Sequence, residues 1–172
     1  FDQSCLLDAM AEAGAITPDL ARRTADAIAR FHGDAPVVHA GTGTRNLAGV
    51  LDINAAGFAA AGFFGDEEVG RLEGRLRAAL ARHAAVLDRR EAEGKVRRCH
   101  GDLHLRNICL LDGEPRLFDC IEFSDRIATV DVLYDLAFLL MDLWRRDLPD
   151  LAGIAMNRYL DGTDNDDGFS LL

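Results

Sequence analysis

The longest regular pattern in this sequence is a helical one between Asp66 and Glu93, so the fold must pack a long amphipathic helix. Along it, apolar residues and one histidine recur every three or four positions, opposite arginines and glutamates: Val69, Leu72, Leu76, Leu80, His83 and Leu87. Gly94 marks the expected end of the helix. Because His83 shares the apolar stripe, we expect a packed histidine there rather than a ligand.

Four further segments carry helical signals. A short helix is predicted to start at Ser4, as its N-cap, and to end at Gly14. A second is predicted from the Thr-Pro pair at 17–18 to the His-Gly pair at 32–33. A strongly apolar helix is expected over residues 131–144, and a last one over about 150–160.

Between residues 34 and 65 the helical period is lost, because glycines stand at positions 41, 43, 49, 57, 62 and 65. We expect loops with short elements in this segment. The run Gly41-Thr42-Gly43-Thr44 lacks the third glycine, the lysine and a clear preceding strand of a phosphate-binding loop. It is therefore interpreted as part of a turn-rich surface.

The pattern changes after the long helix. Residues 96–99 and 108–111 are typical of short strands, Asp112-Gly113 is typical of a hairpin turn, and residues 116–118 predict a returning strand. The order of helices, a small β-region and again helices predicts a mainly helical α+β fold with a small β-hairpin layer.

Charge narrows the range of partners. The 172 residues include 29 acidic and 19 basic ones, which gives a formal net charge of −10. A chain with this balance has no basic patch to release counterions, so we expect binding neither to nucleic acid nor to anionic membranes. The most apolar run, residues 136–141, is far shorter than the roughly 20 residues of a transmembrane helix.

The cysteines and the first residues point to a compartment. The four cysteines form no CxxC pair, which favours buried thiols in a reducing cytoplasm over disulfides or a zinc knuckle: Cys5, Cys99, Cys109 and Cys120. The chain opens Phe-Asp-Gln-Ser, with neither a methionine nor a signal peptide. We therefore expect a cytoplasmic protein of which this chain is a piece.

The chemistry is concentrated in the stretch HGDLHLRN, His100 to Asn107, which lies between two predicted strands. Asp102 supplies a carboxylate, Asn107 a carboxamide five residues later, and the hairpin returns a second carboxylate, Asp119, to the same edge. Phosphoryl transfer needs this set, namely one carboxylate to orient a hydroxyl and accept its proton and two oxygen ligands for Mg²⁺. The spacing His-x-Asp-x-x-x-x-Asn matches the catalytic loop of protein kinases.

The segments HGDLHLRNICL, LFDCIEF and DVLYDLAFLL resemble the aminoglycoside phosphotransferase branch of the kinase-like superfamily. The resemblance implies an ATP-dependent phosphotransferase (ATP or another nucleoside triphosphate) acting on a hydroxyl of a small molecule. By it, Asp102 is the catalytic base and His100 supports the loop. Asn107 and Asp119 are the Mg²⁺ and nucleotide ligands, and Asp135 is a buried anchor that ties the following helix to the loop.

The resemblance covers only part of such an enzyme. It implies a β-rich N-terminal lobe with a glycine-rich loop and a lysine, whereas the 99 residues before His100 carry helical patterns and a single lysine, Lys95. Residues 1–172 are therefore expected to be one kinase-like C-terminal lobe that lacks its N-terminal lobe. The lone chain is expected to be inactive while the full-length parent is an enzyme. Cys120 follows Asp119 where protein kinases have Phe-Gly, but it is no metal ligand.

Two other functions stay open. Asp102-Leu103-His104 after a strand resembles the metal pair of a metallophosphoesterase-type hydrolase, with His100 nearby. A non-catalytic, kinase-like scaffold lobe is the second, although the intact set of Asp102, Asn107 and Asp119 speaks against it.

Single residues near the loop also have plainer readings. Taken alone, Asp102 fits a turn and Asn107 a cap. Glu122 fits a charged loop residue better than a ligand, and His104 fits a polar site and loop packing equally well. The thiols at 99, 109 and 120 are interpreted as small buried hydrophobes.

Overall fold

The computed structural model describes residues 3–39, 41, 43–62 and 65–172. Its elements are, in chain order, η1 (Gln3–Cys5), α1 (Leu7–Glu12), α2 (Pro18–Asp34), α3 (Gly43–Ala61), α4 (Asp66–Ala92), β1 (Val96–Arg98), η2 (Leu105–Asn107), β2 (Ile108–Leu111), β3 (Glu114–Leu117), α5 (Asp125–Ala128), β4 (Thr129–Asp131), α6 (Val132–Arg145), α7 (Pro149–Asp161) and η3 (Asp166–Leu171). This confirms the predicted α+β class with mainly helical content.

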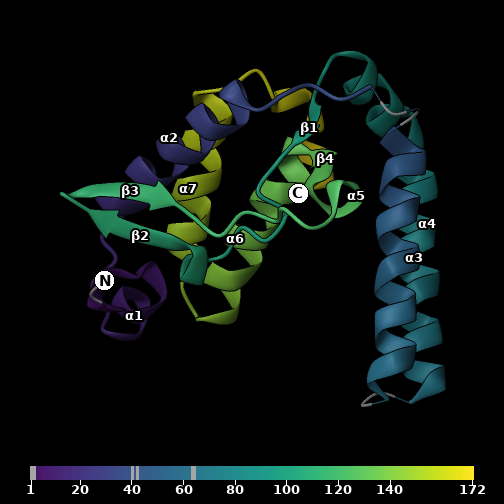
Figure 1. Ribbon diagram of the computed structural model, residues 1–172, viewed down its shortest axis with the longest axis horizontal. Coiled ribbons are helices and arrows are strands. Elements are labelled where there is room, and N and C mark those ends of the chain that lie inside the picture. The colour runs from purple at the N-terminus through teal and green to yellow at the C-terminus, as the bar shows by residue number, and fades with distance from the viewer. Residues whose placement is uncertain (1–2, 40, 42, 63–64) are drawn as a thin grey trace.

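The core lies around α6, which occupies the centre of the molecule (Figure 1). One buried cluster joins side chains from α1, α2, α6, α7 and β2, among them Leu7, Leu20, Ile28, Ile108, Leu136, Leu139 and Tyr159. Leu103 and Leu105, from the stretch between β1 and β2, belong to the same cluster. The hydrophobic core therefore anchors the stretch between β1 and β2, which contains the candidate functional residues.

Two small antiparallel sheets frame that stretch. Strands β2 and β3 pair from Ile108↔Leu117 to Leu111↔Glu114, around the predicted turn. Asp112 and Gly113 have φ of 52° and 79°, the two positive values that a type I′ hairpin turn requires. Strand β1 pairs with β4, a three-residue strand that the sequence analysis did not predict.

Helices α3 and α4 lie side by side and extend away from the rest of the molecule as a long pair (Figure 1). The expectation of loops over residues 34–65 was wrong, because α3 occupies Gly43–Ala61. A Cβ atom on Gly43 would overlap the carbonyl of Leu87, and one on Gly49 would lie 2.8 Å from Arg126 Nη2. These two glycines permit close packing instead of breaking the helix.

The other predicted helix boundaries hold in part. Thr17 caps α2, with its hydroxyl accepting from Leu20 N–H at 3.1 Å. Ser4 does not cap the first helix, since it lies in η1 and α1 starts after Leu6. α4 ends before Gly94, as its sequence predicts.

The run at residues 41–44 is only partly described, since Thr42 lies outside the described residues. Gly43 and Thr44 form the first turn of α3, and Thr44 donates its N–H to Asp88 Oδ1 of α4 at 2.8 Å. The expectation of a turn-rich surface is therefore wrong for these two residues. Within the described ranges, no helix is long and apolar enough to cross a membrane.

Candidate catalytic loop

Residues 100–107 connect β1 to β2, and only the last three form a 3-10 turn, η2. Gly101 has a φ of +83°, and a Cβ there would lie 3.1 Å from Ile121 Cδ1 and 3.3 Å from Ala128 Cα. Glycine alone satisfies both the left-handed backbone and the close approach. The loop therefore makes a sharp turn directly before Asp102.

A buried carboxylate of α6 holds the start of the loop. Asp135, which is fully buried, accepts the N–H of His100 at 3.1 Å and that of Gly101 at 2.8 Å. These bonds satisfy two buried backbone donors that lie outside regular structure. They confirm the expectation that Asp135 ties the following helix to the loop.

The same carboxylate continues into a network that the sequence analysis missed. His32 Nε2 of α2 lies 3.0 Å from Asp135 Oδ2, and its Nδ1 lies 2.8 Å from the hydroxyl of Tyr159 on α7. A carboxylate can only accept, so Nε2–H donates to Asp135, and Nδ1 is hydrogen-bonded to the hydroxyl of Tyr159. From sequence, His32 signalled only a helix end, because its partners are more than a hundred positions away.

A second anchor holds the end of the loop. Asp142, one turn from the end of α6, accepts Leu105 N–H at 3.1 Å and is bonded by Arg145 and Arg146. Burial acts against its charge, but the bonds from Arg145, Leu105 and Arg146 outweigh burial and lower the pKa of Asp142. No sequence signal distinguished this residue from any other helical aspartate.

His100 braces the loop from inside. Its ring is fully buried, Nε2 donates to the carbonyl of Phe118 at 2.8 Å, and Nδ1 lies 3.4 Å from the N–H of Asp102. Its backbone carbonyl accepts Ile121 N–H at 2.9 Å. His100 thus links the loop to the segment that follows β3.

The side chain of Asp102 stands at the loop surface, 45% exposed, between two neighbours. Asn107 Nδ2 donates to the backbone carbonyl of Asp102 at 2.9 Å and to its Oδ2 at 3.2 Å. His104 Nε2 lies 3.3 Å from the same Oδ2, while His104 Nδ1 is buried without a partner among the described residues. One carboxylate oxygen is therefore fixed, and the group stays open to a molecule outside.

Asp119 is brought to the loop through the backbone. Phe118 donates its N–H to the carbonyl of Asn107 at 3.1 Å, and its own carbonyl accepts from His100. Asp119 has a φ of +59°, a left-handed conformation that costs about 1–3 kcal/mol in a non-glycine residue and clusters at functional sites. Asp119 is an exposed residue, and so is Glu122.

The cations next to the loop are engaged elsewhere. Arg98 pairs with Asp125 at 3.0 Å and Arg106 with Asp8 at 3.6 Å. Lys95 bonds the backbone carbonyl of Asp164. None of these three pairs is with Asp102 or Asp119, so the loop retains its negative character.

The donor set fits Mg²⁺. Both described bonds of the Asn107 side chain use Nδ2, which leaves its carbonyl oxygen for a metal. The exposed carboxylate of Asp119 supplies further hard oxygen ligands, the type that Mg²⁺ prefers.

A second group of potential ligands does not fit a metal. Among the described residues, His32, Cys99 and Asp135 have ligand atoms within 4.8 Å of one another. Both His32 nitrogens and both Asp135 oxygens, however, are bonded within the protein. Burial raises the pKa of Cys99 well above its ordinary value, so its sulfur stays protonated. Cys99 is thus a small buried residue, as expected.

A hydrolase-type metal pair gains no support from these contacts. His104 does lie beside Asp102, but the described residues place no third histidine, cysteine or carboxylate ligand with them. Both nitrogens of His100 are used to brace the loop.

Comparison with known proteins points to the same chemistry as residues 100–107. A family model described as "Phosphotransferase enzyme family" matches residues 6–169. Uncharacterized proteins of Mycobacterium tuberculosis (strain H37Rv) and Mycobacterium bovis are each 48% identical over 69 residues, 37% of this chain and 14% of theirs. The chain thus matches only a small part of those relatives. No solved structure matches it.

Proposed function

The chain belongs to the phosphotransferase enzyme family, and from that premise we propose that it carries the catalytic loop of an ATP-dependent kinase-like enzyme. The reaction we propose is transfer of a phosphoryl group to a hydroxyl of a small molecule. The observation that carries the proposal is the joint geometry of Asp102 and Asn107, with Asp119 tied to the same loop through Phe118.

In this reaction Asp102 is the base. Its carboxylate is fixed at Oδ2 by Asn107 and His104 and is open on the other side, which suits a group that orients an incoming hydroxyl and accepts its proton. Phosphoryl transfer requires mainly positioning and charge stabilisation, so a rigid carboxylate is what the chain has to supply.

Asn107 and Asp119 are the residues that we propose hold Mg²⁺ and, through it, the nucleotide. The metal supplies charge neutralisation for the phosphate oxygens when it is bound. The backbones that carry the two side chains are tied together by His100 and Phe118, which connect the loop to the end of β3. His100 is a positioning residue here, because its ring is fully buried and both ring nitrogens are bonded within the protein.

We further propose that residues 1–172 act as the C-terminal lobe of a larger kinase-like protein. Arg98, Arg106 and Lys95 pair elsewhere, and Arg97 donates to backbone carbonyls of residues 32, 33 and 35. Phosphates that approach Asp102 and Asp119 therefore need positive charge from another part of the protein. In a kinase-like enzyme a lysine of the N-terminal lobe supplies this charge. Alone, this chain should bind ATP no better than millimolar.

The test is a transfer assay with the full-length protein. It is incubated with MgATP and a panel of hydroxylated metabolites and aminoglycosides, and phosphorylated products are detected by mass spectrometry. Asp102→Asn keeps the shape but removes the base, so turnover should fall at least about 10³-fold with nucleotide binding retained.

Asp112→Asn is the matched control, because Asp112 is an exposed aspartate in the hairpin turn ten positions along. It should leave turnover unchanged. No product from any acceptor, or an Asp102→Asn variant as active as the control, would refute the proposed function.

A further inference from the structure

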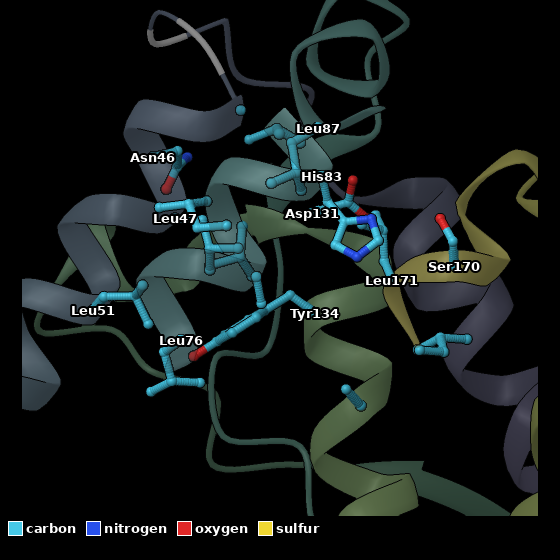
Figure 2. Close-up of a pocket in the computed structure, with 17 residues that line it drawn as sticks. Asn46, Leu47, Leu51, Leu76, His83, Leu87, Asp131, Tyr134, Ser170 and Leu171 are labelled. Carbon is cyan, nitrogen blue, oxygen red and sulfur yellow. The ribbon is translucent and has the colours of Figure 1, made fainter. Parts of the chain in front are cut away.

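A cavity of about 340 Å³ lies where the α3–α4 pair meets the body, away from the catalytic loop. Figure 2 shows it between α3, α4, the first turn of α6 and the C-terminal segment. Its lining includes none of Asp102, Asn107 and Asp119. It is therefore separate from the proposed phosphoryl-transfer site.

The walls of the cavity are mainly apolar. Val96 and Val130 line the cavity on the side of the paired strands β1 and β4. The two long helices contribute leucines: Leu47, Leu51, Leu76, Leu80 and Leu87. Leu76 is 38% exposed, although it belongs to the stripe that α4 turns toward α3. The predicted apolar stripe of α4 is thus only partly covered by protein, and its exposed residue Leu76 lines this cavity.

Polar side chains stand around the apolar walls without protein partners. The side chains of Asn46, His83 and Ser170 line the cavity, and no side-chain hydrogen bond is found for them among the described residues. Figure 2 shows Asn46 and Ser170 on opposite sides, with the His83 ring between them. The expectation of a packed core histidine at position 83 is thus corrected, since the half-buried ring of His83 borders this cavity.

Charge limits what can bind. Among the described residues of the lining, Asp131 is the only charged one, and its two carboxylate oxygens are bonded by Arg90 at 2.8 and 2.9 Å. Because these lining residues include no lysine or arginine, they cannot neutralise a phosphate or a carboxylate. With Asp131 already paired, the same residues offer no free negative charge for a polycation either.

We propose that this cavity binds a small, neutral, mainly apolar molecule that carries hydrogen-bonding groups. Its volume lies within the range of about 300–1,000 Å³ that is typical of small-molecule sites. Apolar walls with a few unpartnered polar groups are the usual composition of such sites. Asn46, His83 and Ser170 fix the orientation of the ligand, and the leucines provide most of the contact.

The test uses N-phenyl-1-naphthylamine, a neutral apolar fluorophore with one N–H donor, titrated into the full-length protein. Ala79→Phe fills the cavity from α4, whereas Ala78→Phe adds the same ring one position along, on an exposed residue outside the lining. We expect binding to the wild type and to Ala78→Phe with similar affinity, and at least about tenfold weaker binding to Ala79→Phe.

Ala137→Phe fills the same cavity from α6 and serves if Ala79→Phe fails to fold by circular dichroism. His83→Leu keeps the apolar contact but removes a hydrogen-bonding group, so it should weaken the amine probe by about two- to tenfold. Equal affinities for the filled and control variants, or no binding to the wild type, would overturn the proposal. The proposal would also be overturned if a second copy of the protein fills the cavity. This outcome would be detected as a wild-type dimer that Ala79→Phe dissociates.

Discussion

Helix α4 passes through two environments that use the same residue type in opposite ways. Near its end, Arg90 is fully buried and bonds Asp131 through two nitrogens, as well as Asp167 and Asn165. Thirteen positions earlier, in the extended α3–α4 pair, Arg77 is 43% exposed and bonds Asp52 and Glu73 at the surface. Figure 1 shows how far this pair extends from the body.

The two regions differ in how their geometry is maintained. In the body, buried carboxylates of α6 hold the loop at both ends, Asp135 at residues 100–101 and Asp142 at Leu105. In the extended pair, α3 approaches α4 closely at Gly43, and the leucine stripe of α4 is partly uncovered at Leu72 and Leu76. Polar networks therefore set the geometry of the loop, whereas the extended pair shapes the cavity.

The largest expected contrast in stability lies between the two arginines. Arg90→Ala leaves the buried Asp131 without its partner and should lower the free energy of unfolding by about 3–5 kcal/mol. Arg77→Ala removes only exposed ion pairs and should lower the free energy of unfolding far less than Arg90→Ala. Urea denaturation of both variants checks this, and losses of equal size would show that the body and the extended pair are not different in this respect.

A smaller effect is expected from the network behind the loop. His32→Leu leaves the buried Tyr159 hydroxyl without His32 and removes one of the two bonds to Asp135 Oδ2, which should cost about 1–3 kcal/mol of stability. Because Asp135 also holds the loop, kcat of the full-length protein should fall more than KM for ATP rises. His32→Gln can restore the bond to Asp135 and should recover part of kcat; no recovery, with fold and stability intact, would count against a positioning role.

Two glycines of α3 allow a finer comparison. Gly43→Ala places a methyl group against the Leu87 carbonyl and should destabilise the protein by about 1–3 kcal/mol. Gly57 has open space around it, so Gly57→Ala should stabilise α3 by about 0.5–1 kcal/mol. Thermal unfolding of both variants gives the answer. If both changes have the same sign, close packing does not explain Gly43.

The smallest effect is a pH dependence that Asp142 contributes. Its pKa is lowered in the folded protein, so the unfolded chain binds its proton at a higher pH. The stabilisation is present above the ordinary aspartate pKa of about 3.9 and is lost as the pH falls through the lower folded value. Stability measured from pH 6 to pH 3 should fall less steeply in Asp142→Asn than in the wild type, and identical slopes would contradict this role.

The parts predicted correctly from sequence depend on local chemistry. Asp112-Gly113 specifies its own turn, Thr17-Pro18 starts its own helix, and the spacing of HGDLHLRN placed Asp102 beside Asn107. α3 was missed because the sequence alone does not distinguish a glycine that breaks a helix from one that allows a helix to pack closely against its neighbour. β4 was missed because three residues have no period of their own, and their partner β1 is about thirty positions away.

The loop itself was predictable, but its support was not. Asp135 could be expected from the resemblance, whereas His32, Tyr159 and Asp142 became visible only once distant helices were packed together. A hydrogen bond between positions 32 and 135 leaves no trace in local spacing or composition.

The central claim is that Asn107 and Asp119 form one metal–nucleotide centre in the body, to which the extended α3–α4 pair adds nothing. Mn²⁺ in place of Mg²⁺ tests it directly, because its unpaired electrons broaden the NMR signals of nearby backbone amides. With a non-hydrolysable ATP analogue and the full-length protein, amides of residues 100–107 and 118–121 should broaden, and Asp119→Asn should abolish the effect. Broadening centred on the acidic first turn of α4, or unchanged by Asp119→Asn, would contradict the account.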